Sequence, residues 1–167
     1  MIKIVRYIIL FIVIVLVQLL VCNNIQFSGY VNPYVYILFI LVLPVQIQTW
    51  MMLLIAFGLG FLIDVFCDTM GLHIFATVAA AFVRPFVLSI VAPRDGYDPM
   101  LDLSMHSYGI KWYLTYSSII VFVHHFLLFY LEVFRLSNFF GTLLRVILSS
   151  IISLIFIVLC EFVRRWD

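Results

Sequence analysis

An all-α integral membrane protein with about six transmembrane helices is the fold class that the sequence predicts. Of its 167 residues, 66% are apolar and only 10% are charged, and the mean hydropathy is +1.26. A soluble domain usually has about 45–50% apolar and about 25% charged residues. The apolar residues also form continuous stretches close to the roughly 20 residues that a membrane helix needs. We therefore expect residues 1–167 to form a single integral membrane domain.

The charge balance and the absence of catalytic motifs exclude several functions. Nine Lys and Arg against eight Asp and Glu give a formal charge of +1, so no basic field attracts nucleic acid and the expected surroundings are a lipid bilayer. The sequence contains no GxSxG, HExxH or glycine-rich phosphate loop, so we expect no enzyme, catalytic residue, metal or cofactor. Cys22 and Cys67 belong to no CxxC pattern, and we expect free thiols.

Six apolar stretches account for most of the chain. The first follows Lys3 and Arg6, a start that is also typical of a secretory signal. No small residues precede a cut at Cys22, so we expect an uncleaved helix. The stretches are Ile4–Val21, Tyr34–Val45, Thr49–Phe66, Leu72–Ala92, Trp112–Val133 and Phe140–Val163.

The second stretch leaves two alternatives, because Pro44 interrupts it early and Gln46 and Gln48 follow. In one, Tyr34–Phe66 forms a single kinked helix. Such a helix would be about 50 Å long, which exceeds the hydrocarbon thickness of about 30 Å. In the other, a short second helix, a tight turn and a third helix follow one another. We favour the second alternative.

Six crossings place both termini on one side of the membrane. Positive residues gather in cytoplasmic loops, so both termini are expected to be cytoplasmic and Pro93–Lys111 becomes the longest cytoplasmic connection. The other side receives Arg135 alone. The basic residues on the side of the termini are Lys3, Arg6, Arg94, Lys111, Arg164 and Arg165.

Charged residues within the apolar stretches predict polar pairs between helices, because an unpaired charge in a membrane is costly. Asp64 and Arg145 fall at a similar height, so a pair between them would join the third and sixth stretches. The alternative is that Arg145 snorkels outward and Asp64 lies among headgroups. Arg84 precedes Pro85, and Glu161 is the nearest acid at comparable depth, so Arg84 and Glu161 form the second candidate polar pair. We expect Arg84 to act as a structural clamp.

A divalent metal site is a further possibility at Asp64, Asp68 and His73, which are closely spaced. Asp68 and Thr69 fit equally well as caps of the next helix, and we expect no metal. His124 and His125 are adjacent and point about 100° apart on a helix, so a buried hydrogen-bonding role is expected for them.

Pairs of small residues four positions apart predict faces where helices approach closely. Such faces pack within the bundle or bind the helix of an external partner. The candidate partner-binding residues are Ala56, Gly60, Ala76, Ala80, Ser149 and Ser153.

Several short motifs resemble those of the rod shape-determining protein MreD family. The most specific are the turn Gly71-Leu72-His73, which follows Gly58–Asp64, and the loop Arg94–Pro99. The resemblance covers most of the chain from about residue 30 onward, and the first stretch matches only in hydrophobicity. Further matches are His124-His125-Phe126, Leu131-Glu132, Asn138-Phe139-Phe140 and Leu144-Arg145.

The resemblance implies a non-catalytic role in the bacterial inner membrane. MreD proteins lie beside the single-span protein MreC. They act with the actin-like MreB, the glycosyltransferase RodA and its transpeptidase partner in the machinery that elongates the peptidoglycan wall. We therefore expect a scaffold or regulator that sets cell shape. The family is also similar in fold to the S-components of energy-coupling-factor transporters, so the alternative is an S-component-like membrane subunit that binds a small solute for transport.

Overall fold

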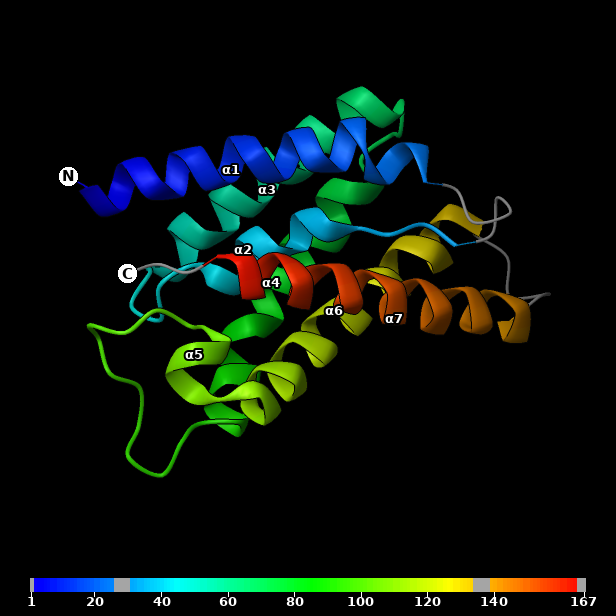
Figure 1. Cartoon of the computed structure of the whole chain (residues 1–167). Coiled ribbons are helices and arrows are strands. Elements are labelled where there is room, and N and C mark those ends of the chain that lie inside the picture. The colour runs from blue at the N-terminus through cyan, green and yellow to red at the C-terminus, as the bar shows by residue number, and fades with distance from the viewer. Residues whose placement is uncertain (1, 26–30, 134–138, 165–167) are drawn as a thin grey trace.

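The computed structural model describes residues 2–25, 31–133 and 139–164 (Figure 1), and it forms no β-strand within these ranges. The predicted all-α class is confirmed. The last described residue lies at the same end of the bundle as the start of α1, and we call this the terminal end and the opposite one the far end. The elements are α1 (Ile2–Leu20), η1 (Cys22–Asn24), η2 (Val35–Ile37), α2 (Leu38–Val42), α3 (Thr49–Cys67), α4 (Leu72–Ile90), α5 (Met105–Tyr108), α6 (Ile110–Val133) and α7 (Phe139–Val163).

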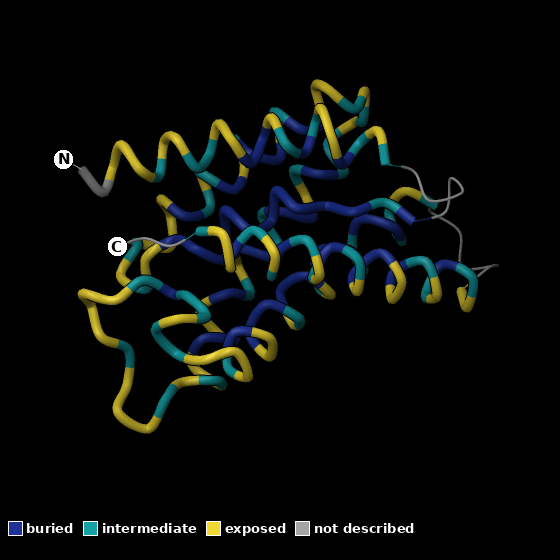
Figure 2. Tube along the Cα trace, viewed as in Figure 1, coloured by how far each residue is buried: buried dark blue, intermediate teal, exposed yellow. Residues whose placement is uncertain are grey.

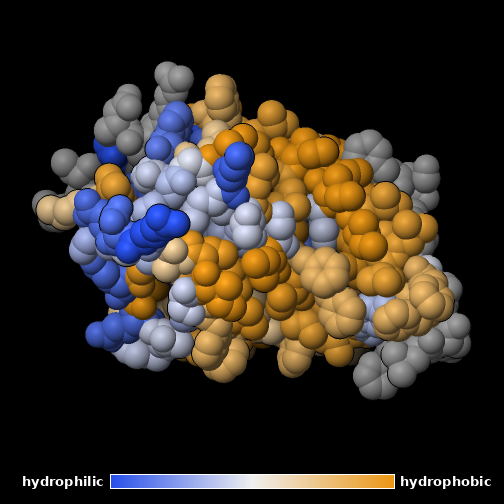
Figure 3. All heavy atoms as spheres, turned by 90° about the horizontal axis from the view of Figure 1, so that it is seen from below, coloured by the Kyte–Doolittle hydropathy of each residue, from blue (hydrophilic) through white to orange (hydrophobic). Residues whose placement is uncertain are grey.

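Five helices in the described ranges, α1, α3, α4, α6 and α7, are long and apolar enough to cross a membrane. Large hydrophobic side chains cover their outward faces, which is the arrangement that lipid requires. Figure 3 shows this apolar surface on one side of the molecule, with hydrophilic residues gathered at the terminal end. The chain is therefore a multi-pass membrane protein.

The sixth pass is made by residues 31–43, which we call the central segment. It is extended at first, then turns through η2 and ends in α2. Its combined length is about 27 Å, because extended residues rise more steeply than helical ones. The predicted short second helix is thus shorter still, and the single kinked helix is wrong because residues 43–48 form a non-helical connection before α3.

The central segment avoids lipid because the long helices surround it (Figure 2). Every residue of it is buried except Asn32, which is half-buried. It packs between α1 on one side and α7 on the other. Irregular backbone is tolerated at membrane depth only inside protein, so this burial explains how a segment too short to be a membrane helix can traverse the bundle.

The remaining helices pack in sequence order, α3 on α4, α4 on α6 and α6 on α7. The closest approach is at Gly60, where an added methyl group would lie 2.6 Å from the Cα of Ile74. The six small residues predicted to bind a partner are all buried inside this bundle. Because no external helix can reach them there, that prediction is corrected: Ala56, Gly60, Ala76, Ala80, Ser149 and Ser153 serve internal packing.

We predict that Gly60→Ala destabilises the protein while Gly58→Ala does not. The new methyl group at Gly60 meets the backbone of α4, and such overpacking costs about 1–3 kcal/mol. At Gly58 nothing lies within 4 Å, so the higher helix propensity of alanine is expected to raise stability by about 0.5–1 kcal/mol. Thermal unfolding of both variants in detergent measures the difference, and equal melting temperatures would contradict the packing described.

Candidate functional site

The peptide groups at the start of the central segment are hydrogen bonded by side chains from α1 and α7. Gln18 Oε1 accepts the backbone N–H groups of Val35 at 2.7 Å and Tyr36 at 3.2 Å, and Gln18 Nε2 donates to the Pro33 carbonyl at 3.1 Å. The hydroxyl groups of two serines on α7 complete the set. Ser149 Oγ accepts from Asn32 N at 3.3 Å and Ser153 Oγ accepts from Tyr34 N at 2.9 Å.

The hydrogen bonds of Ser153 and His125 determine where their protons lie. His125 Nδ1 lies 2.8 Å from the Val121 carbonyl oxygen, which can only accept, so Nδ1 carries the proton. Nε2 must then accept, and Ser153 Oγ donates to it at 2.9 Å. The predicted buried hydrogen-bonding role of His125 is confirmed.

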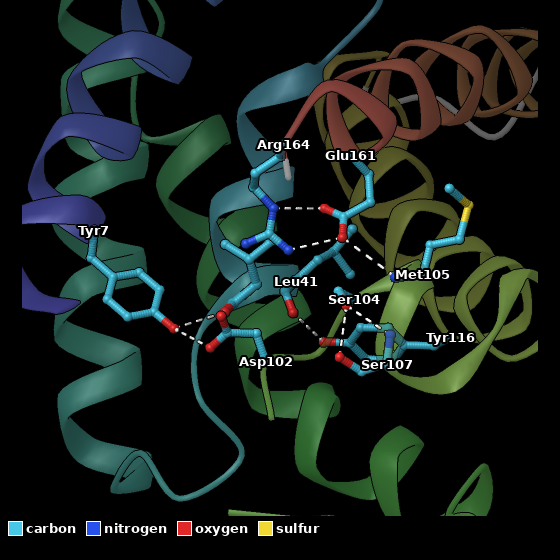
Figure 4. Close-up of polar contacts among 10 residues, drawn as sticks. Tyr7, Leu41, Asp102, Ser104, Met105, Ser107, Tyr116, Glu161 and Arg164 are labelled. Atoms are coloured by element: carbon cyan, nitrogen blue, oxygen red, sulfur yellow. Dashed lines mark hydrogen bonds and ion pairs between the residues drawn. The ribbon is translucent and has the colours of Figure 1, made fainter. Parts of the chain in front are cut away.

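The end of the central segment is held by side chains from three other helices. Tyr116 on α6 donates to the Leu41 carbonyl at 3.0 Å (Figure 4), and Tyr7 on α1 contacts the Val42 carbonyl at 3.5 Å. Arg84 on α4 donates to the Leu43 carbonyl and, at 2.8 Å, to Tyr116.

Arg84 is therefore a structural clamp, as predicted, but its expected partner was wrong. Its guanidinium is buried and binds the carbonyl of Leu43 and the phenol of Tyr116 in place of the carboxylate of Glu161. Leu43 ends α2 with an extended ψ of 146°, so its carbonyl has no partner within that helix, and Arg84 satisfies it. Sequence depth alone could not show that acceptor.

Glu161 instead ties the C-terminal end of α7 to the connection between α4 and α6. It accepts two hydrogen bonds from Arg164, both at 2.8 Å, and one from the backbone N–H of Met105 at 3.4 Å (Figure 4). Asp102 in the same connection lies 3.5 Å from the hydroxyl of Tyr7. These contacts close the terminal end of the bundle around the last residues of the central segment.

Asp64 caps the N-terminus of α4. Its carboxylate accepts the backbone N–H groups of His73 at 3.0 Å and Ile74 at 2.9 Å, and the hydroxyl of Thr69 at 2.5 Å. Carboxylates are stabilising at helix N-termini. The alternative in which Asp68 and Thr69 cap this helix is wrong, because Asp68 ends α3 in the left-handed conformation with φ 54° and Thr69 donates to Asp64.

Arg145 is bound by Glu132, so the predicted Asp64–Arg145 pair is wrong. Arg145 Nη1 lies 3.1 Å from Glu132 Oε2, and its guanidinium also stacks 4.3 Å from the centroid of Phe129. The predicted pair rested on similar heights alone. Asp64 instead bonds backbone groups at the start of α4, and Arg145 bonds Glu132 on α6. Glu132 and Arg135 are three residues apart, a spacing that predicts a local pair on a helix, but Arg135 lies outside the described residues.

The sequence did not predict the buried hydrogen-bonded cluster in the far half of the bundle. The hydroxyl of Tyr36 lies 3.0 Å from His73 Nδ1 and 2.5 Å from His124 Nε2. Thr77 lies 3.3 Å from the same hydroxyl, while its own proton goes to the carbonyl of His73 at 2.6 Å. The ring of Tyr34 packs against both histidines. Three elements contribute, and no spacing within one stretch could reveal them.

Two hollows accompany these polar groups. A cavity of about 390 Å³ lies at the far end and is lined by residues from η1 to α6, including His73 and Glu132; we call it the end cavity. A larger hollow of about 1010 Å³ lies between α1 and α3, with α2 at its base; we call it the lateral groove. Among the residues that the structure describes, no cluster of three or more His, Cys, Asp or Glu could hold a metal.

The chain matches no protein-family model, no curated protein and no solved structure.

We predict that Gln18→Leu lowers the stability of the fold strongly. The change leaves the N–H groups of Val35 and Tyr36 buried without an acceptor, and each such group costs about 1–3 kcal/mol. Asn24→Leu is the control, because Asn24 is exposed and, among the described residues, its side chain donates only to the Leu20 carbonyl at the end of α1. Thermal unfolding in detergent should show a large loss for the first variant and little for the second.

We also predict that exchanging Glu132 and Arg145 preserves the fold. Glu132→Arg or Arg145→Glu alone places like charges together, and the double exchange restores the pair. Glu132 is partly exposed, so the coupling is expected to be about 0.2–1 kcal/mol. A double-mutant cycle of melting temperatures measures it.

A double-mutant cycle that starts from Asp64→Lys tests whether Asp64 and Arg145 interact. Adding Arg145→Asp should give no rescue, because Asp64 binds backbone N–H groups of α4. Rescue would show that Asp64 and Arg145 interact after all.

Proposed function

We propose that this chain is a non-catalytic, MreD-like component of the bacterial cell-elongation machinery, in which it holds the membrane helix of an MreC-like single-span protein. The observation that carries the proposal is the lateral groove. It opens on the side of the bundle, where a helix embedded in the same bilayer can enter it. A scaffold in a membrane acts by this kind of lateral packing.

The lateral groove has apolar walls and an apolar floor. Ile8 and Phe11 of α1 form one wall, Met51 and Ile55 of α3 form the other, and Phe39 of α2 lies at the base. Phe11 and Phe39 meet edge to face at 5.1 Å, so α1 rests mainly on the central segment. This leaves the space beside α3 open.

Gly58 offers the close approach that helix packing in membranes favours. It lines the groove, it is half-buried, and nothing lies within 4 Å of its position. Gly60 is two residues further along α3 and therefore about 200° around the helix. One glycine of the pair faces α4 and the other faces the groove, which separates internal packing from an external docking face.

The polar mouth of the groove matches a basic helix flank. Asp98 and Asp102 line it, and none of the described lining residues is a lysine or arginine. Single-span proteins with a cytoplasmic N-terminus carry Lys or Arg beside the membrane helix. If the terminal end is cytoplasmic, as the charge distribution predicts, such a flank lies against these two carboxylates.

The connection between α4 and α6 supplies a second candidate surface for the filament and the synthase. It protrudes from the terminal end (Figure 1) and is held by the hydrogen bonds of Tyr97 to the Leu88 carbonyl and Trp112 to the Val91 carbonyl, both 2.8 Å. Beyond these anchors Met100 is 80% exposed. Because it is the longest connection at the terminal end, we assign it as the contact surface for an MreB-like filament or a RodA-type synthase and its transpeptidase.

We predict that changes in the lateral groove abolish capture of an MreC-like protein. Gly58→Leu fills the docking face, and Asp98→Lys with Asp102→Lys reverses the charge at the mouth. Affinity purification of the tagged chain from its own membrane, followed by identification of bound single-span proteins, measures the effect. The paired charge reversal is expected to reduce capture at least about tenfold, which corresponds to about 1.4 kcal/mol.

The control is Ile151→Leu, which alters an exposed apolar residue of α7 outside the groove. It should leave capture unchanged. Full capture by the folded groove variants would overturn the proposed docking face, and the absence of any single-span partner in the wild-type sample would overturn the proposed function.

A further inference from the structure

The end cavity is a built polar site that the proposed scaffold does not use. It lies at the far end, away from the mouth of the lateral groove, and the start of the central segment forms part of its wall. At about 390 Å³ it falls within the range of about 300–1,000 Å³ that is typical of small-molecule sites. Tyr34 and Phe66 contribute aromatic rings, and polar side chains lie between them.

Most polar groups in the wall are already bonded within the protein. Thr69 donates to Asp64. Asn23 accepts from Gln18 at 2.9 Å and donates to Cys67 Sγ at 3.2 Å. His73, which is 3% exposed, keeps a free nitrogen: its Nδ1 is bonded to Tyr36, and its Nε2 has no hydrogen bond to any described residue.

The charge in the cavity is balanced before any ligand arrives. Glu132 is the acidic residue in the described lining, and it is paired with Arg145. Asp64, just behind the wall, accepts three hydrogen bonds. A charged ligand would therefore lose its hydration without gaining a free counter-charge, so the site favours an uncharged molecule.

His73 Nε2 can either accept or donate, because the hydrogen bonds of Tyr36 allow two proton arrangements. The Tyr36 hydroxyl has one proton for two imidazoles. If it donates to His124, then His73 Nδ1 carries a proton and Nε2 accepts. If it donates to His73 Nδ1, then Nε2 carries the proton and donates. Nδ1 of His124, which has no hydrogen-bond partner, carries a proton in the first arrangement and none in the second.

We propose that the end cavity binds a small uncharged heteroaromatic molecule, which hydrogen bonds His73 Nε2 and packs against the rings of Tyr34 and Phe66. The inference does not depend on the scaffold function. It names a ligand class by three observations on the same hollow: aromatic walls, a balanced charge, and one buried imidazole nitrogen without a partner.

Cys67 provides a reporter for the test, because it lines the cavity and is a free thiol. The variant Cys22→Ala/Cys160→Ala keeps it as the chain's single cysteine. The probe is benzimidazole, which is uncharged at neutral pH and has one N–H donor and one nitrogen acceptor. Benzimidazole at about twice its Kd is expected to slow alkylation of Cys67 by a soluble maleimide about threefold. Benzoate, a ring of similar class with a negative charge, is expected to have no effect.

His73→Phe in the same background keeps the ring and removes the nitrogen, so protection by benzimidazole should be lost. If this variant fails to fold, Leu72→Trp replaces it, since Leu72 lines the cavity and a larger side chain there fills the space. The matched control is Cys22→Ala/Cys67→Ala, whose remaining Cys160 lies outside the cavity lining and should show no change. Absence of protection at Cys67, protection that persists in the folded His73→Phe or Leu72→Trp variant, or equal protection of Cys160 would overturn the proposal.

Discussion

Three side-chain oxygens, those of Gln18, Ser149 and Ser153, accept the N–H groups that open the central segment, and the rest of the fold depends on these bonds. In hydrocarbon an unbonded peptide group costs several kcal/mol. An α-helix avoids this cost by bonding to itself, but an extended chain cannot. The central segment therefore exists only because polar side chains of α1 and α7 are aimed at it, and this requirement explains why those residues interrupt otherwise apolar helices.

The lateral groove is a consequence of the same segment. A full-length helix in its place would support α1 and α3 along their whole length. The central segment is partly extended and ends in only five helical residues, Leu38–Val42, so it fills less of the space between them. The peripheral position of α1 and the hollow beside it thus follow from the small volume of the central segment. They leave one side of the bundle where another membrane helix can lie.

Hydropathy predicted the long helices well, because the length of an apolar stretch is set by the bilayer. The stretch Thr49–Phe66 became α3, Thr49–Cys67, and Leu72–Ala92 became α4, Leu72–Ile90. Depth along a helix was equally readable. The rotation of each helix about its axis could not be predicted from hydropathy. Both predicted ion pairs were wrong for that reason, because similar heights do not show which helix faces meet.

The cluster of Tyr36, His73 and His124 was inaccessible to sequence reasoning for a different reason. Its geometry depends on the extended start of the central segment, and Tyr34–Val45 has the composition of a short apolar helix. The spacing of Gly58 and Gly60, in contrast, does carry information about helix rotation. Residues two apart on a helix face nearly opposite ways, so that pair already implied one contact inside the bundle and a second face available outside.

The serine hydroxyl groups of α7 have a consequence for biogenesis. Residues 31–43 leave the ribosome long before Ser149 and Ser153 are synthesised, so the backbone that these serines accept from cannot be satisfied during the early insertion steps. The nascent segment must stay at the water interface, or be shielded by the translocation machinery, until α7 is released. The hydrogen bonding of the central segment is accordingly completed by α7, and the arrival of that helix, rather than the insertion of any earlier one, sets the moment at which the bundle can close.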